Sequence, residues 1–540
     1  MTGCLRPERG VDELTPEDAG TTLPSQPATL TVEDQDDRAP AAVPTLPEQP
    51  RNNRSVVALL VAVACTVLGA KLITVSALAS SMPIMDQWDA EAARLYSPYL
   101  SGNLSAADLF APHNEHRIFM QRILALLHLE LAGEWNPRLQ MALQAVVHTA
   151  VVTWLAANLL PLVAGRHRTI LAGFIALLFA IPFGYENTLW GFQGQLYFML
   201  LFGITAIVAF AGARPFSLRW FGGLLAAILS FFSFATGATS ILTAGGLVAL
   251  QLITNARQRG GREYAGVAVI VAIALAMFLW TASGSHPMST PWTFVQGLLL
   301  LTARVIVAAV PIVWFARYTL ARRPAVSDRA WAVVGLSAWI AIQLVLLAYG
   351  RGTVIAVRYN DIILLAYPIG LVAVFTLVDH AIGKDRRRFS TPKVATTWVF
   401  GVVAVFALMG YIAILGAIDW NKSNRQQAVN VQTYFATHSV EQLKAKGNNG
   451  GTFDLAYPNS LRLAEVLSDP NVRAILPPEI RPADADNAGA RDRLALKGSV
   501  AGITASALHV VLMIGPVLLA VGMAAFFALG TRAGFAARRV

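Results

Sequence analysis

Residues 55–80 read SVVALLVAVACTVLGAKLITVSALAS, and this stretch decides the fold class. It contains a single charged side chain, Lys71, and it is long enough to cross the hydrocarbon core of a bilayer as an α-helix. Comparable apolar runs recur along the chain. We predict twelve membrane spans, at residues 55–80, 138–164, 168–183, 190–212, 218–235, 238–254, 264–282, 293–316, 330–348, 361–380, 394–417 and 501–529. The expected fold is therefore all-α, a polytopic integral membrane protein with about 12 transmembrane helices.

The composition of the 540-residue chain agrees with a membrane protein. Hydrophobic residues make up 55% of the chain and charged residues only 14%, whereas a soluble chain carries about 25% charged residues. So little polar surface cannot coat a water-soluble body, which excludes soluble enzymes and fibrous proteins. The two cysteines, Cys4 and Cys65, lie in a polar tail and inside a span, so we expect no structural disulfide.

Basic residues between the spans predict the orientation of the chain. The net charge is +10, but residues 1–50 carry −7, so the remainder carries +17. With the N-terminus inside, the basic residues fall in alternate loops, as the positive-inside rule requires. These loops contain Arg166, Arg168, Arg214, Arg219, Arg257, Arg259, Arg262, Arg317, Arg322, Arg323, Arg329, Lys384, Arg386, Arg387, Arg388 and Lys393. The prediction is N-in and C-in, in a bacterial cytoplasmic membrane, with the basic charge acting as a topogenic signal and not as a nucleic-acid site.

The chain divides into four parts. Residues 1–54 form an acidic, Pro-rich cytoplasmic tail whose composition predicts disorder. Residues 55–418 form the transmembrane core of about 11 spans, including a long extracytoplasmic loop, 81–137, in which Ile118–Leu131 can lie along the interface as an amphipathic helix. Residues 419–500 form an extracytoplasmic segment or small helical domain, with Gly447–Gly451 as a flexible break. Residues 501–540 hold the last span and a basic cytoplasmic end.

A first polar cluster follows the first span and contains Asp86, Gln87 and Asp89 around Trp88. Asp86 and Asp89 are three residues apart and would share one face of a helix. A partly desolvated carboxylate at the membrane surface can act as a general base or bind a divalent metal. Alternatively, Asp86 caps the following helix and Glu91 is a solvated surface residue.

A second cluster contains His113, Asn114, Glu115, His116 and Arg117. It places a carboxylate, two imidazoles and a guanidinium within five residues, a set that can bind a phosphate, a metal or a sugar. The spacing of the histidines also occurs in zinc sites, which need further ligands. The alternative is a helix start, with His113 or Asn114 near the cap and Arg117 reaching to the interface.

The third cluster, at the outer end of the fourth span, contains Tyr185, Glu186, Asn187, Trp190, Phe192, Gln193 and Gln195. Polar amides one turn into a span usually face the protein interior or a cavity. Aromatic rings beside amides and a carboxylate suit a sugar, because rings stack on its C–H face and amides bind its hydroxyls. Ordinary interfacial aromatics are the alternative for Tyr185 and Trp190.

The fourth cluster lies between the ninth and tenth spans and contains Arg351, Arg358, Tyr359, Asn360 and Asp361. The two arginines are the only bases in the short outer loops, against the topology rule. A guanidinium binds phosphate oxygens in a bidentate manner, so the pair suits a phosphate group. The alternative is an ion pair between Arg358 and Asp361.

All four clusters fall on the same side of the membrane in the predicted topology. We therefore expect acids, arginines and aromatic rings to converge on one site at the outer leaflet. The sequence contains no Walker loop, dinucleotide fingerprint or nucleophile elbow, so ATP-driven chemistry within the chain is not expected.

Several short motifs together resemble a known family. They are Asp86-Gln87-Trp88-Asp89, Pro112-His113-Asn114-Glu115-His116-Arg117, Glu186-Asn187-Thr188-Leu189-Trp190-Gly191-Phe192-Gln193, Tyr457-Pro458 and Asp469-Pro470-Asn471-Val472-Arg473-Ala474-Ile475-Leu476-Pro477. With an acidic motif after the first span, a long outer loop and a late extracytoplasmic segment, residues 55–529 resemble the GT-C superfamily of membrane glycosyltransferases, in particular a group of bacterial members.

The resemblance implies transfer of a sugar from a polyprenyl-phosphate donor at the outer face. It gives the role of base on the acceptor hydroxyl to Asp86, with Asp89 as the second candidate. Glu115 is a further catalytic candidate, from the second cluster. A carboxylate of raised pKa would remove the acceptor proton, and Arg351 or Arg358 would hold the leaving phosphate. Many members carry adjacent acids where this chain has two acids separated by two residues, which leaves both the base and a divalent metal open. The expected substrate contacts are His113, His116, Arg117, Glu186, Asn187, Trp190, Gln193, Arg351, Arg358, Tyr359 and Asp361.

The expected function is thus a membrane glycosyltransferase that modifies a cell-envelope glycan or lipid. Its partners would be the polyprenyl-phosphate sugar, the envelope acceptor and membrane lipid, and no nucleic acid. The alternative is a transporter or flippase, a class that usually places charges near the membrane midplane. Lys71 is the clearest such charge in the sequence. A third interpretation is a non-catalytic assembly subunit whose outer segment binds a partner.

Overall fold

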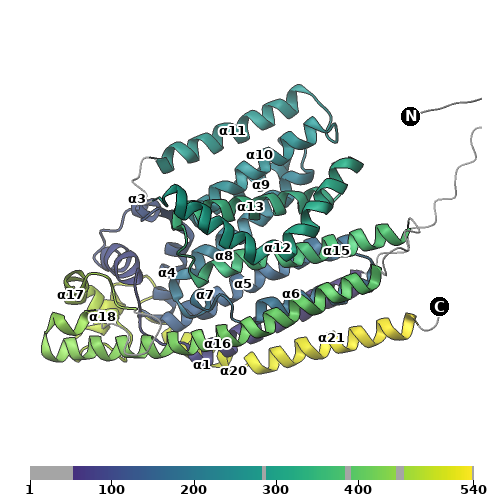
Figure 1. Cartoon of the computed structure of the whole chain (residues 1–540). Coiled ribbons are helices and arrows are strands. Elements are labelled where there is room, and N and C mark those ends of the chain that lie inside the picture. Colours follow the sequence, from purple (N-terminus) through teal and green to yellow (C-terminus); the bar gives the residue numbers. More distant parts are fainter. Residues whose placement is uncertain (1–52, 283–287, 384–390, 445–454, 538–540) are drawn as a thin grey trace, which may run out of the picture. The chain divides into compact units, whose positions relative to one another are not determined.

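The structure is a computed structural model that describes residues 53–282, 288–383, 391–444 and 455–537 (Figure 1). Within these ranges the regular secondary structure is helical except for two short strands, β1 (Pro112–His113) and β2 (His116–Arg117), which pair as an antiparallel hairpin. The predicted all-α class is confirmed. The acidic tail up to residue 52, the loop bases Lys384 to Arg388 and the glycine-rich stretch Gly447–Gly451 lie outside the described residues.

Long apolar helices dominate the described residues. Nine are long and apolar enough to cross a membrane: Arg54–Leu78, Pro137–Leu162, Gly191–Gly212, Ala235–Ile253, Gly261–Thr281, Pro291–Arg322, Ala330–Arg351, Val357–Ala381 and Lys393–Thr437. A tenth consists of α20 (Ala501–Met513) and α21 (Gly515–Ala537), which are bent by 42° at their junction. The chain is therefore a multi-pass, membrane-embedded helical protein.

Two of the twelve expected spans are shorter helices. The expected span 168–183 corresponds to α6 (Gly165–Ala180), and the expected span 218–235 corresponds to α9 (Leu218–Phe231). Fourteen residues of α9 rise by about 21 Å, which is less than the hydrocarbon thickness of about 30 Å. By length and composition the described residues thus contain nine or ten spans, and the count of twelve stays a prediction.

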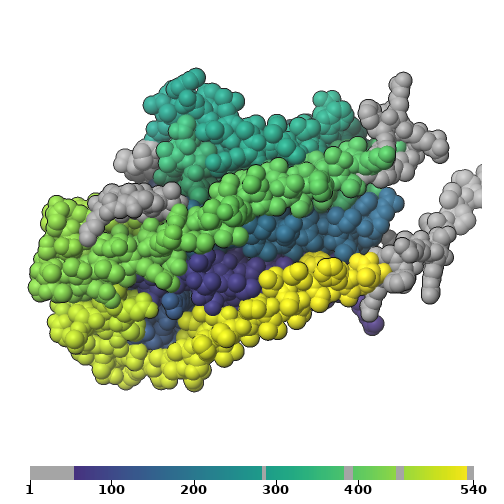
Figure 2. Space-filling view, turned by 60° about the horizontal axis from the view of Figure 1, so that its bottom comes forward, coloured from purple at the N-terminus to yellow at the C-terminus, as the bar shows by residue number. Residues whose placement is uncertain are grey.

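Helix α1 (Asn53–Leu78) packs against α21 along a line of glycines. A Cβ atom at Gly69 would lie 2.4 Å from the backbone nitrogen of Leu519, and one at Gly522 would lie 2.2 Å from the hydroxyl of Thr66. Small residues let two helix backbones approach closely, which is how helices associate within membranes. Figure 2 shows the result, with α21 lying along α1 on the surface of the molecule.

A large apolar core forms between α1, α5 (Pro137–Leu159), α6, α8 (Gly194–Gly212), α13 (Ala330–Arg351) and α15 (Ala366–Gly383). Helix α10 (Ala238–Ile253) packs on α8 and α13 beside it. In contrast, α11 (Gly261–Ala282), α12 (Pro291–Arg322) and α16 (Thr391–Thr437) keep large apolar side chains exposed, such as Phe278, Trp314 and Phe400. Such surfaces suit contact with lipid and would be insoluble in water.

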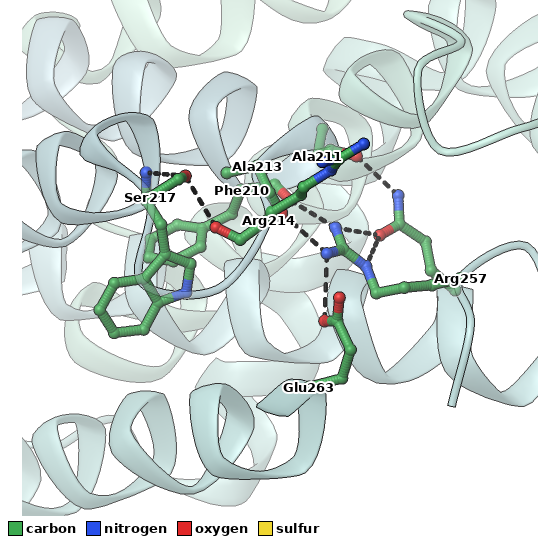
Figure 3. Close-up of polar contacts among 9 residues, drawn as sticks. Phe210, Ala211, Ala213, Arg214, Ser217, Arg257 and Glu263 are labelled. Atoms are coloured by element: carbon green, nitrogen blue, oxygen red, sulfur yellow. Dashed lines mark hydrogen bonds and ion pairs between the residues drawn. The ribbon is translucent and has the colours of Figure 1, made fainter. Parts of the chain in front are cut away.

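The connection between α10 and α11 is held by a buried arginine (Figure 3). The Arg257 guanidinium donates to the side-chain oxygen of Gln251, to the carbonyls of Phe210 and Ala213, and to the carboxylate of Glu263, which lies 3.2 Å away. The carbonyls of Phe210 and Ala213 lie at the C-terminal end of α8, where the last carbonyls of a helix have no N–H partner within the helix. One side chain therefore fixes the end of α8, the loop and the start of α11.

The two long segments, 81–137 and 419–500, fold together. Helix α16 continues as a single 47-residue helix to Thr437 and is followed by short helices α17 (Ser460–Ser468), α18 (Pro470–Ile475) and α19 (Asn487–Asp492). Helices α17 and α18 pack on the helical turns of Trp88–Tyr96 (η1), and η1 in turn packs on α4 (Phe119–Ala132), the helix expected at 118–131. Helix α20 also packs on α4. A second apolar core joins the two segments and includes Trp88, Trp135, Leu467 and Ile475.

Candidate functional site

A short buried helix, α7 (Tyr185–Leu189), lies next to the candidate site. This helix lies between α6 and α8, and all five of its residues are buried. Its non-helical flanks leave carbonyls that must find partners away from water. The amide of Gln144 donates to the carbonyls of Asn187 and Trp190, and the amide of Asn360 donates to that of Phe183. Side chains from neighbouring helices thus replace the missing backbone bonds of this segment.

A polar cavity of about 440 Å³ lies beside α7, and residues from all four sequence clusters line it. Its walls come from the turn after α1, from the β1–β2 hairpin, from the start of α8 and from the segment after α13. The lining residues are Met85, Asp86, Asn114, Glu115, His116, Trp190, Phe192, Gln193, Gln195, Phe234, Arg351, Arg358 and Tyr359. Sequence segments up to about 270 residues apart therefore meet at one place, as we expected from the predicted topology.

Asp86 lies in a tight turn whose first residue, Met85, has a φ of 49°. Its carboxylate is 41% exposed, and its Oδ2 atom lies 3.9 Å from Nε2 of His113. Burial favours the neutral acid, but the interaction with His113 and the charge of Arg358 outweigh it, so the pKa of Asp86 is lowered. The expectation of a raised pKa is thus wrong, and the carboxylate is ionised at neutral pH.

Glu115, Arg351 and His116 form a second charged group on the hairpin side of the cavity. The Arg351 guanidinium pairs with the Glu115 carboxylate and also donates to the hydroxyl of Tyr359 at 3.2 Å. The His116 ring stacks on Phe234, with centroids 4.0 Å apart. Burial lowers the pKa of His116 to about 4, although the charge of Glu115 opposes the shift. His116 is therefore neutral at pH 7.

Arg358 also lines the cavity. Its Nη1 atom lies 3.1 Å from the Glu186 carboxylate, and its guanidinium sits 5.8 Å from the Trp190 ring centroid and 5.5 Å from that of Tyr359. Burial raises the pKa of Glu186 and the charge of Arg358 opposes the shift. The alternative pair of Arg358 with Asp361 does not form; the described partner of Arg358 is Glu186.

The third wall consists of aromatic and amide groups. Trp190, Gln193 and Gln195 are each at most 3% exposed, yet all three line the cavity. The indole nitrogen of Trp190 and the amide oxygen of Gln195 are buried and have no hydrogen-bond partner. Buried polar groups are normally paired, so these two atoms are exceptions within the wall.

A buried hydrogen-bond network underlies the turn of Asp86. The Glu91 carboxylate accepts hydrogen bonds from the side-chain amides of Gln87, Gln121 and Gln140 at 3.0, 3.0 and 3.1 Å. Burial raises the pKa of Glu91, and these amides oppose the shift. The idea that Glu91 is a solvated surface residue is wrong, because it is 1% exposed. The network fixes the first turn after Asp86 to α4 and α5.

A second buried network lies below α7, among the spanning helices. Lys71 donates to the hydroxyl of Thr188 at 2.9 Å and interacts electrostatically with Asp361. Asp361 accepts hydrogen bonds from Asn187 at 2.8 Å and from Tyr197 at 3.1 Å. Lys71 therefore pairs inside the protein and does not reach to the interface. The network joins α1, α7, α8 and the segment that carries Arg358.

Several expected site residues lie outside the cavity wall. Asp89 does not share a face with Asp86: its two carboxylate oxygens pair with Arg94 at 2.9 Å and Arg462 at 3.1 Å. The helical-face expectation is wrong because Asp86 lies in a turn. Arg117 stacks over Trp280, 5.3 Å from its centroid. His113, Glu186, Asn187 and Asp361 support the lining residues from behind.

The second cluster is also not the start of a helix, because residues 112–117 form the β1–β2 hairpin and α4 begins two residues later. Asn114, at the tip, has a φ of 52°, which asparagine tolerates in tight turns. The hairpin turns Glu115 and His116 toward the cavity. Among the described residues, no group of three or more histidine, cysteine, aspartate or glutamate side chains is arranged to hold a metal ion.

Sequence reasoning missed Gln140, Gln144 and His148. They recur every fourth residue along a predicted span and so share one helix face. Polar residues inside a span normally face the protein interior, and this spacing is a signal that could have identified them. His148 stacks on Tyr197 with centroids 4.1 Å apart.

No protein-family model matches the chain, and the comparisons with curated proteins and with solved structures found no match either. The fold and the cavity define the class: a multi-pass helical membrane protein with a polar, charge-paired cavity that lies between its helices and the long segment 81–137.

Proposed function

We propose that the chain is a glycosyltransferase of the bacterial cytoplasmic membrane that takes a sugar from a polyprenyl-phosphate donor at the outer face. One observation carries the proposal. Asp86, two arginines and an aromatic–amide wall, which come from four distant segments, line the same cavity. An acid, a phosphate-binding pair and a sugar-binding wall are the three parts that this transfer needs.

The proposed reaction is a displacement at the anomeric carbon. The acceptor hydroxyl oxygen forms the new bond to that carbon, and the bond from carbon to the phosphate oxygen breaks. Asp86 receives the hydroxyl proton, for which it must be ionised, as its lowered pKa provides. The polyprenyl phosphate leaves as an anion whose charge Arg351 and Arg358 stabilise.

Arg351 and Arg358 each pair with a carboxylate, but each can still bind a phosphate. A guanidinium has five N–H donors, and the pair of Arg358 with Glu186 uses its Nη1 atom. The remaining donors can serve a phosphate while the carboxylate holds the side chain in place. The ring of Trp190 and the side-chain amide of Gln193, which line the same cavity, suit the C–H face and the hydroxyls of a sugar.

A transport function is the second candidate, and the Lys71–Asp361 network supports it. Both residues are buried within segments long enough to span the membrane. Ionisable residues in such places often belong to substrate or ion pathways. In the glycosyltransferase proposal the same network only holds Asn187 and, through it, the backbone of Arg358.

A proteoliposome assay tests the proposal and separates it from transport. Full-length wild type and Asp86→Asn would receive radiolabelled polyprenyl-phosphate sugars together with envelope extract. The control is Asp108→Asn, an acid of the same loop that lies outside the cavity lining. We expect label to move to the acceptor, with a loss of about 10²–10⁴-fold in Asp86→Asn and none in the control.

Other outcomes redirect or reject the proposal. Loss in Asp89→Asn with full activity in Asp86→Asn would keep the enzyme and move the base. Label that crosses the bilayer without chemical transfer, and that depends on Lys71 and Asp361, would establish transport instead.

A further inference from the structure

A second cavity lies far from the candidate site along the chain's helices, at their basic end, where α6 begins, α15 ends and α16 begins. Its volume is about 650 Å³, within the range of small-molecule sites. The wall is almost entirely apolar and includes Ile170, Phe375, Val378, Val399, Phe400 and Val403. Figure 2 shows α16 and α6 running side by side on this face of the molecule.

Polar groups are confined to one end of this groove. Arg166 and His167 of α6 line it, and both contact Asp379 near the end of α15. The His167 ring stacks on Phe375 with centroids 4.2 Å apart, which places the polar end directly beside the apolar wall. The Arg166 side chain is 63% exposed despite its ion pair. Its guanidinium is therefore accessible at the mouth of the groove.

A second base stands on the other side of the mouth. Lys393 is exposed and precedes Thr396, Val399, Phe400 and Val403 by three, six, seven and ten residues. These spacings put Lys393 on the helix face that lines the groove, one turn beyond its apolar part. The charged side chains described at the mouth are Arg166, Lys393 and Asp379, so two positive charges outweigh one negative charge.

We propose that this groove binds an anionic phospholipid from the leaflet at the basic end, which the distribution of basic residues predicts to be cytoplasmic. The groove would hold an acyl chain, and Arg166 and Lys393 would bind the phosphate headgroup. We choose an anionic lipid on the ground of charge complementarity, because basic residues beside the end of a membrane span attract anionic lipids. A concave site also retains a lipid longer than the convex, lipid-facing remainder of α16.

Native mass spectrometry of the full-length, delipidated protein tests this proposal. The probes are dioleoyl phosphatidylglycerol, dioleoyl phosphatidylcholine with the same chains, and inorganic phosphate. We expect wild type to retain phosphatidylglycerol in preference to phosphatidylcholine. Arg166→Gln and Lys393→Gln should each weaken phosphatidylglycerol retention by about fivefold and leave phosphatidylcholine unchanged. Asp379→Asn should strengthen it, because it frees the Arg166 guanidinium.

Matched variants keep the test specific to the groove. Val399→Trp fills the cavity and should reduce retention of both lipids, whereas Val405→Trp, on the exposed side of α16, should not. Arg329→Gln, an exposed base that precedes α13, controls for general charge. Size-exclusion profiles and unfolding temperatures establish that each variant is folded.

Three results would overturn the proposal: equal retention of the two lipids by wild type, an equal effect of Arg166→Gln and Arg329→Gln, or an equal effect of Val399→Trp and Val405→Trp. Binding of inorganic phosphate with no gain from the acyl chains would likewise reject a lipid as the occupant.

Discussion

The guanidinium of Arg358 lies 3.1 Å from the carboxylate of Glu186, although the two residues are 172 positions apart in the chain. The side chain of Glu186 is 6% exposed and that of Arg358 is 26% exposed. The pair joins α7 to the segment after α13, and both ends of it support the cavity. Its two members therefore depend on one another for their positions and for their charges.

We expect Glu186→Gln and Arg358→Met each to lower the free energy of unfolding by about 2–4 kcal/mol, because each leaves a largely buried charge without its partner. The double variant should lose clearly less than the sum of the two. Unfolding in detergent measures the cycle. The exposed pair of Arg322 and Asp328 is the control and should contribute at most about 1 kcal/mol. Strictly additive losses at Glu186 and Arg358 would contradict the pairing.

His116 should make stability depend on pH. Its pKa is about 4 in the folded protein and about 6.5 in an unfolded chain. Between these values the unfolded state binds more protons, so stability falls as pH is lowered through this window and is unaffected above it. We expect the unfolding temperature to fall between pH 7 and pH 4.5, and to fall less in His116→Phe, which keeps the stack on Phe234.

The control for this pH effect is His438→Asn, because His438 is exposed and asparagine tolerates its φ of 54°. This variant should show the same pH dependence as wild type. An identical pH dependence in wild type and His116→Phe would exclude His116 as the source. Some dependence should persist in His116→Phe, because burial also lowers the pKa of His128, to about 3.

Gly184→Ala should destabilise the protein by about 1–3 kcal/mol. A Cβ atom at Gly184 would lie 2.5 Å from the carboxylate of Asp361, which Asn187 and Tyr197 hold in place. The matched variant is Gly173→Ala in α6, where no atom lies within 4 Å of the added Cβ. Thermal unfolding compares the two. Equal stability of both variants would show that the Asp361 network can shift freely.

Arg257→Lys should destabilise the protein nearly as much as Arg257→Ala. The planar guanidinium reaches Gln251, Ala213 and Glu263 together, and an ammonium group cannot reproduce that fork. We expect a loss of about 2–3 kcal/mol, since the partners are buried. Arg262→Lys, at an exposed position in the first turn of α11, should be neutral. Wild-type stability in Arg257→Lys would contradict the role of the fork.

Most of the helices could be predicted from the sequence, because a helix that crosses a bilayer needs about 20 consecutive apolar residues. Every predicted span corresponds to a helix, although α6 and α9 are shorter than the run of apolar residues suggested. Local hydropathy does not predict where a helix ends once it has left the membrane. Helix α16 continues far past residue 418 because its polar half packs against the short helices that follow it.

The gathering of the four clusters was predictable from topology, but the partners within the cavity were not. Nothing near Glu186 in the sequence indicates Arg358, and nothing near Glu91 indicates Gln121 and Gln140. Long-range pairing depends on how the spans pack, and hydropathy carries no information about that. The helical-face rule also failed for Asp86, because the chain turns at Met85 before the helix begins.

The 47 residues of α16 form one rod about 70 Å long. Its apolar half contacts α15 and its polar half contacts α17 through the turn at 440–443. A helix rotates by about 100° for each residue. Adding or removing one residue between Trp420 and Asn430 would therefore swing the whole outer segment around the rod and detach Arg462 from Asp89. The number of residues in this part of the helix therefore determines where the outer segment docks.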